Sequence, residues 1–183
     1  TINIVGQGSV NKVPNQPTYT YGSSVQLTAV PQSGWYFSFW GGDLSGSTNP
    51  DTIVMNGNRN VTATFNLSYA PVVTANSAQN VTSGSATLYG VLNDKGTATT
   101  VSVSFEWATD SYYANNGNSY NNETNPPGSM VSTGAFSFSL GGLSPETTYH
   151  FRAKATGQGT AYGNDMTFTT IPLQPPNQPP NVY

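Results

Sequence analysis

The stretch GWYFSFWGGD, which starts at Gly34, places five aromatic side chains within six consecutive positions of a chain rich in Thr, Asn, Ser and Gly. Exposed rings of this kind can stack on a ligand, whereas buried rings dominate the cores of small domains. In an extended strand Tyr36 and Trp40 share one face, and the other three rings share the opposite face. We expect most of these rings, Trp35 among them, to be structural, and Tyr36 and Trp40 to form the candidate ligand platform.

A second candidate surface is the segment 110–133, which shows neither strand nor helix periodicity. Segments of this length inside compact domains are usually functional or mobile. Tyr112, Tyr113 and Tyr120 stand there among amide side chains, a composition typical of adaptable binding surfaces. Two interpretations stay open: a solvated excursion with a short extra hairpin, or a recognition loop that binds a partner.

The residues that usually carry catalysis are sparse. Cysteine is absent, which excludes thiol nucleophiles, disulfides and cysteine metal sites. His150 is the only histidine, so we expect a surface histidine and neither a zinc cluster nor a Ser-His-Asp arrangement. The acidic residues fall mainly in turns, where they do not suggest the paired carboxylates of a hydrolase. We predict no enzymatic activity, no cofactor and no metal site.

Charge narrows the class of partner. Charged residues make up 7% of the chain and the net charge is −3, so no basic patch is available for nucleic acid or an anionic membrane. No apolar run is long enough to span a bilayer. The expected partners are other copies or adjacent domains of the same surface protein, or surface glycans, without nucleic acid or membrane insertion.

The elements that must position these residues are predicted to be strands. Asn, Ser, Thr and Gly disfavour helices, while β-branched and aromatic residues fit pleated sheets. Apolar and polar residues alternate with a period of two in several short runs. We predict an all-β chain with candidate strands at 1–5, 24–30, 35–40, 51–55, 61–65, 85–92, 101–109, 135–140, 148–155 and 164–170.

Residues 1 to 66 carry a family pattern. Its pieces are GQGSV, a Tyr-Gly before SVQLTA, the Gly-Trp opening, a Trp before Gly-Gly-Asp and the closing NVTATF. These pieces resemble the divergent internalin B-repeat, which occurs in tandem on bacterial surface proteins. The resemblance implies a small β-grasp-like domain, placed at residues 1–67, and no catalytic residues.

The stretch LSPETTYHFRAKA, Leu143–Ala155, resembles a fibronectin type III domain where its sequence leads into strand F. The resemblance implies a β-sandwich over residues 68–171, in which the hydroxyl of Tyr149 bonds back to upstream backbone as a tyrosine corner. Trp107, which we expect to be structural, lies in a later strand than is usual for the family. The domain therefore resembles a divergent bacterial variant.

Strand alternation also places charges. Glu106 points outward from the strand at 101–109, and Arg152 and Lys154 point outward from the strand at 148–155. These strands are neighbours in a fibronectin-like sandwich, so we predict that Glu106 pairs with Arg152 or Lys154.

The last segment, 172–183, is proline-rich and typical of an extended linker. We expect it to lie against another copy or the following domain. Together these features predict a non-catalytic extracellular or cell-surface module, a spacer or repeat unit of a bacterial surface protein, stalk or filament. The alternative is a carbohydrate-binding module that uses exposed aromatic side chains. Burial of Trp35, Trp40 and Trp107 favours the first interpretation.

Overall fold

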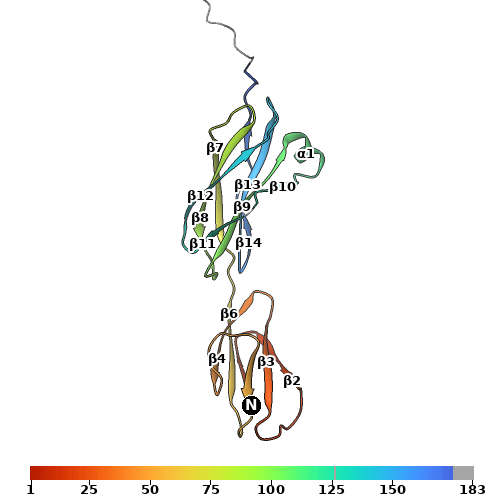
Figure 1. The fold of residues 1–183 in the computed structure, drawn as a ribbon, viewed down its shortest axis with the longest axis vertical. Coiled ribbons are helices and arrows are strands. Elements are labelled where there is room, and N and C mark those ends of the chain that lie inside the picture. Colours follow the sequence, from red (N-terminus) through yellow and green to blue (C-terminus); the bar gives the residue numbers. More distant parts are fainter. Residues whose placement is uncertain (126, 175–183) are drawn as a thin grey trace, which may run out of the picture. The chain divides into compact units, whose positions relative to one another are not determined.

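The computed structural model describes residues 1–125 and 127–174. Over these residues the regular secondary structure is almost entirely β-strand, with a single short helix, α1 (Asp110–Asn115), which confirms the predicted all-β class (Figure 1). The chain divides into two compact units, unit 1 (Thr1–Tyr69) and unit 2 (Ala70–Tyr183).

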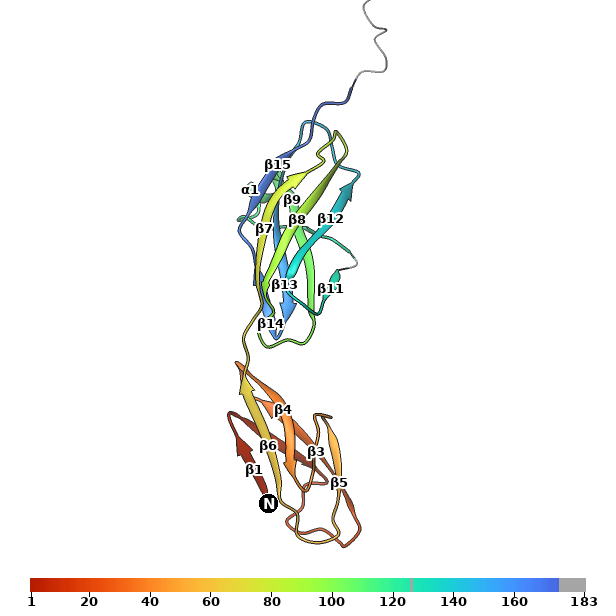
Figure 2. The same cartoon turned by 90° about the vertical axis from the view of Figure 1, so that its left-hand side faces the viewer.

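Unit 1 consists of two three-stranded sheets that share one core (Figure 2). The strand orders are β1 (Ile2–Val5), β6 (Val61–Leu67), β4 (Trp35–Gly42) in the first sheet and β2 (Gly8–Val13), β3 (Ser24–Pro31), β5 (Asp51–Val54) in the second. The first and last strands, β1 and β6, run parallel, and the other paired strands run antiparallel.

Alternating side chains of β3 and β6 build the core of unit 1. Val25 and Leu27 of β3 are buried, and so are Ala63 and Phe65 of β6. The intervening residues of both strands are less buried, as a period of two requires. Gly8 lies so close to the Phe65 ring that a Cβ on it would come within 2.6 Å of the ring. The Phe65 ring therefore occupies the space that a side chain at position 8 would need.

Unit 2 is a β-sandwich, which confirms the predicted fibronectin-like architecture. One sheet has the order β12 (Gly134–Gly141), β8 (Ser85–Asp94), β7 (Val72–Gln79). The other has the order β10 (Asn122–Glu123), β9 (Val101–Thr109), β13 (Thr148–Gly157), β14 (Gly159–Tyr162), with β11 (Gly128–Met130) paired to β9 and β15 (Met166–Thr169) paired to β13. Both sheets contribute to the core, including Leu88, Phe105 and Phe151.

Tyr149 makes the hydrogen bond that a tyrosine corner requires. Its ring is buried, and its hydroxyl oxygen accepts from the backbone N–H of Ser144 at 2.8 Å. Trp107 packs against the same core, with its ring centroid 5.9 Å from that of Tyr149. Both side chains are thus held in the interior packing of the sandwich.

The register of β9 and β13 confirms the predicted ion pair. Glu106 lies directly opposite Arg152. Arg152 donates to Glu106 Oε2 from Nε at 2.9 Å and from Nη2 at 2.7 Å, and Lys154 Nζ lies 3.2 Å from Oε1. Alternation places these charges correctly because both strands pair here without a bulge.

The segment 110–133 contains α1 and the two short strands β10 and β11, both of which pair antiparallel with β9. Thr109 caps the helix, since its Oγ1 accepts from the backbone N–H of Tyr112 at 3.3 Å. The helix has only six residues, too few for a helical period to be recognised. We call this segment the excursion.

The end of the chain is described in part. The predicted linker, 172–183, lies outside the described residues from position 175 onward. Within residues 1–125 and 127–174, no helix has both the length and the apolar character needed to span a membrane.

Candidate functional site

The predicted platform of Tyr36 and Trp40 does not exist, because β4 is bulged. Its register to β6 runs from Phe37 opposite Phe65 directly to Phe39 opposite Thr64, with Ser38 as the extra residue. A bulge of one residue reverses the alternation beyond it. Trp40 therefore points inward, where it is 1% exposed and its Nε1–H donates to the Thr48 carbonyl at 2.9 Å. It cannot stack on a ligand.

The bulge assembles an aromatic core from one strand. Trp35 and Phe37 are half-buried and pack against the core, and the Phe37 ring lies 4.8 Å from that of Trp40 and 5.9 Å from that of Phe65. Trp35, Phe37 and Trp40 thus share the inner side, so the expected grouping of Phe39 with Trp35 and Phe37 was wrong.

The outer face of β4 carries Tyr36 and Phe39. Phe39 is 47% exposed and lies beside Thr64, while Tyr36 is half-buried beside Asn66. Alternation did not predict that Phe39 lies on the outer face, because the residue types at this point do not indicate a bulge. This face therefore presents two aromatic rings beside the Thr64 hydroxyl and the Asn66 amide. No charged residue lies opposite Tyr36 or Phe39 in the register.

The tyrosines of the excursion are used internally. The Tyr113 ring stacks on the His150 ring with a centroid distance of 4.0 Å and an angle of 8°. Tyr120 donates from its hydroxyl to Asp165 at 2.6 Å. Burial and then this hydrogen bond raise the pKa of Tyr120, so its hydroxyl stays protonated. The side chain of Tyr112 is half-buried. The three tyrosines do not form one exposed binding surface.

His150 is not the free surface histidine that the sequence predicted. Its side chain is only 14% exposed, and its ring nitrogens lie 2.7 Å from Asp165 and 3.1 Å from Asp110. Partial burial lowers the pKa of His150, but the bonds to Asp165 and Asp110 outweigh it and raise the pKa above its ordinary value. The alternation was correct, and the excursion covers the face onto which His150 points.

A second polar cluster lies on the same face. Glu106 and Glu123 stand opposite each other on paired strands, and Lys154 Nζ bridges them at 3.2 and 2.8 Å. The bond to Glu123 raises the pKa of Lys154, although desolvation opposes the shift. Arg152 lies between two rings, with its guanidinium 4.6 Å from the Tyr120 centroid and 3.9 Å from that of Tyr162. Each of these charges is thus neutralised within unit 2.

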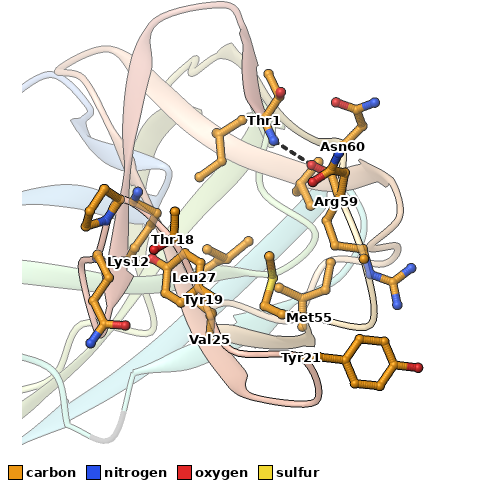
Figure 3. Close-up of a pocket in the computed structure, with 17 residues that line it drawn as sticks. Thr1, Lys12, Thr18, Tyr19, Tyr21, Val25, Leu27, Met55, Arg59 and Asn60 are labelled. Carbon is orange, nitrogen blue, oxygen red and sulfur yellow. Dashed lines mark hydrogen bonds between the residues drawn. The ribbon is translucent and has the colours of Figure 1, made fainter.

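Unit 1 has an open pocket of about 930 Å³ at the end where β1 begins (Figure 3). Apolar residues, including Val25 and Leu27, lie along it together with Lys12 and Arg59, whereas Tyr21 points away from it. None of its lining residues is an aspartate or glutamate, so the pocket lacks the carboxylate pair of a glycosidase. Among the described residues, no three His, Cys, Asp or Glu side chains gather in a group that could hold a metal ion.

Comparison with known proteins finds partial matches. No curated protein matches the chain. Similar solved structures include the sensor domain of the anti-sigma factor RsgI4 of Pseudobacteroides cellulosolvens, at 18% identity and a TM-score of 0.43, covering 57% of this chain and 98% of that one.

Two further solved structures contain fibronectin domains. The third fibronectin III domain of the human KIAA0343 protein has 15% identity and a TM-score of 0.39, covering 60% of this chain and 90% of that one. The FN1–FN3 domains of chicken CNTN1 have 11% identity and a TM-score of 0.39, covering 82% of this chain and 61% of that one.

The family comparison concerns the first part of the chain. Residues 1–68 match the model of the divergent InlB B-repeat domain, which confirms the resemblance seen in the sequence. This match ends one residue before the end of unit 1. Unit 1 is therefore the part of the chain that corresponds to the divergent InlB B-repeat domain.

Proposed function

We propose that the chain is a non-catalytic extracellular module that serves as a spacer or repeat unit of a bacterial surface protein, stalk or filament. The InlB B-repeat family is found in bacterial surface proteins. Domains of this family and fibronectin-like sandwiches are generally non-catalytic. The observation that carries the proposal is that the side chains best suited to chemistry or stacking, His150 and Trp40, are engaged inside their own units.

The surroundings of His150 support a structural role. A general base needs a ring nitrogen within hydrogen-bond reach of its substrate. Both nitrogens of His150 are bonded to carboxylates, and Tyr113 covers one face of the ring. His150 therefore joins α1 to β13 and to the segment between β14 and β15, and it has no nitrogen left for a substrate.

The partners of such a module, in this proposal, are other copies or adjacent domains of the same surface protein. A net charge of −3 over 183 residues opposes contact between copies only weakly.

A display experiment tests the spacer role. The chain is placed between a cell-wall-anchored segment and a terminal reporter domain on a bacterial surface, and binding of antibody-coated beads to the reporter is measured. The chain should increase bead binding relative to a fusion that lacks it, because two folded units extend the reporter from the wall. A fusion with Tyr36→Ala and Phe39→Ala should perform equally well. Absence of any gain with the intact chain contradicts the spacer role.

Tyr36 and Phe39 favour a second candidate function, carbohydrate binding on the outer face of β4. Aromatic rings beside neutral polar groups suit an uncharged glycan better than a charged one. Affinity electrophoresis in gels that contain neutral polysaccharides tests this candidate. Retardation that is lost in Tyr36→Ala/Phe39→Ala but kept in Tyr21→Ala, a change at a tyrosine that is 79% exposed, supports it. Unchanged mobility of the intact chain contradicts it.

A further inference from the structure

The two ends of unit 1 lead into neighbouring parallel strands. Thr1 precedes β1, and β6 ends at Leu67, two residues before Tyr69. The register pairs Ile2 with Val61 and Val5 with Thr64, so both strands begin at the same end of the sheet, as Figure 2 shows. A pull on the two ends of the unit therefore acts on the start of β1 and on the far end of β6.

Such a pull slides the two strands past each other. The hydrogen bonds of a parallel ladder are evenly spaced along the strands, so sliding loads all of them together. A pull on both strands at the same end would instead open the bonds one after another. Shearing is the harder route because several bonds must break in a single step.

The two strands are held differently against this load. β6 is central in its sheet, since it also pairs with β4 over seven residue pairs, and its inward side chains are buried. β1 pairs only with β6, and its Ile4 and Val5 are 46% and 54% exposed. A pull along the chain is therefore expected to release β1 before β6.

Contacts at both ends of β1 fasten it to β6. At its start, the Thr1 carbonyl accepts from the Val61 N–H at 3.0 Å. At its end, Gly6 lies so close to the Phe65 carbonyl that a Cβ on it would come within 2.2 Å of the oxygen. Gly6 also has a φ of +85°, which favours glycine. The chain therefore stays in contact with β6 beyond the last ladder pair.

We propose that β1 and β6 form a mechanical clamp, by which unit 1 resists force applied along the chain. Unit 2 has no equivalent ladder within its described residues, because its first strand, β7, pairs with β8 while its last, β15, pairs with β13. The biological use of the clamp rests on the spacer role proposed above. The mechanical resistance of the clamp does not depend on that role. Force spectroscopy can therefore contradict the clamp while the display experiment supports the spacer role, and the display experiment can fail while the clamp is confirmed.

Pulling geometry tests the clamp in the full chain. Cysteine is absent, so introduced cysteines are unique attachment points for single-molecule force spectroscopy. Thr1→Cys with Tyr69→Cys loads the strands in shear, and Gln7→Cys with Tyr69→Cys pulls at the same end of both. The first pair should require a several-fold higher unfolding force at equal pulling speed. Equal forces in the two geometries overturn the proposal.

A matched pair of proline variants tests the ladder itself. Since the Val61 N–H donates to Thr1, the alternation of a parallel ladder turns the N–H of Asn3 toward β6 and that of Ile4 toward the open edge. Proline removes the N–H. In the Thr1–Tyr69 geometry, Asn3→Pro should lower the unfolding force more than Ile4→Pro, and the reverse order contradicts the clamp. The geometry comparison changes neither position, so it decides the question if a proline variant fails to fold.

Discussion

The outer faces of the sheets differ between the two units in how far other segments cover them. In unit 1, Phe39 of β4 is exposed and Tyr36 is half-buried, and neither has a charged partner in the register. Unit 2 covers the face of β9 and β13 with the excursion, which places Tyr113 on His150 and Glu123 on Lys154. An uncovered neutral face tolerates exposed rings, whereas a covered face must pair each charge that it encloses.

The two units also differ in the regularity of the strands that carry these faces. β9 and β13 pair without a bulge, and alternation correctly predicts Glu106 beside Arg152. β4 carries one extra residue at Ser38, and alternation therefore wrongly places Trp40 on the same face as Tyr36. Alternation is thus a reliable guide only as far as the next bulge.

The largest expected effect tests the bulge in unit 1. Trp40→Ala should destabilise the unit by about 3–5 kcal/mol, because it removes a buried ring and leaves a cavity. Phe39→Ala, at the neighbouring exposed position, should cost less than ~1 kcal/mol. Denaturant unfolding of both variants, followed by hydrogen exchange of unit 1 amides, measures the difference. Equal losses for the two variants would refute the inward turn of Trp40.

A smaller effect is expected at the tyrosine corner of unit 2. Tyr149→Phe keeps the buried ring but leaves the Ser144 N–H without its partner, at a cost of about 1–2 kcal/mol. Tyr162→Phe is the matched control, since that ring lies over Arg152 on the outer face. Thermal unfolding monitored by near-ultraviolet circular dichroism reports the change. A control that loses as much as Tyr149→Phe would assign the effect to hydroxyl loss in general.

A still smaller effect is expected from the covered charges. Glu106→Gln removes the negative charge that faces Arg152 and Lys154, which should cost about 1 kcal/mol because the pairs are partly solvated. Glu146→Gln, at an exposed turn position, should change the free energy of unfolding by less. Adding 1 M salt should narrow the gap between the two variants. A gap that salt does not reduce would speak against an electrostatic origin.

The smallest expected effect is the pH dependence of His150. Its pKa is raised in the folded protein, so the folded state binds this proton more tightly than the unfolded state, in which the pKa is about 6.5. The stabilisation is therefore complete below that value and lost as pH rises through the folded pKa. The thermal midpoint of unit 2 should therefore fall as the pH rises above about 6.5.

His150→Gln supplies the control for this pH dependence. Glutamine keeps a hydrogen-bonding side chain but does not titrate, so the fall in the midpoint over this range should be reduced. Three titratable or charged groups contact the ring, namely Asp110, Asp165 and Tyr113. Tyr120 contacts Asp165 and Tyr113, and Arg152 lies over the Tyr120 ring. An unchanged slope in the variant would assign the dependence to one of these groups.

Much of the fold was predictable from local pattern. Period-two runs predict β3, β6, β9 and β13, and for β3, β6 and β13 also the buried side, because these three strands each have one face in the core. On β9, Ser104 and Ala108 of the other side are buried as well. The candidate site was less predictable. The bulge at Ser38 has no marker among the neighbouring residue types, and α1 is too short to show a helical period. These two features decide which aromatic side chains are exposed.

Composition and alternation were sufficient for the all-β class, because both depend on residues close in sequence. The family resemblance of residues 1 to 66 identified the first unit, and the Glu106–Arg152 pair needed alternation together with the fibronectin-like strand order. Folding in three dimensions was needed to bury Trp40, to bring Asp110 and Asp165 onto His150, and to set β1 parallel to β6. These contacts join residues that are distant along the chain, and their geometry follows from how strands and loops pack together. No local pattern carries that information.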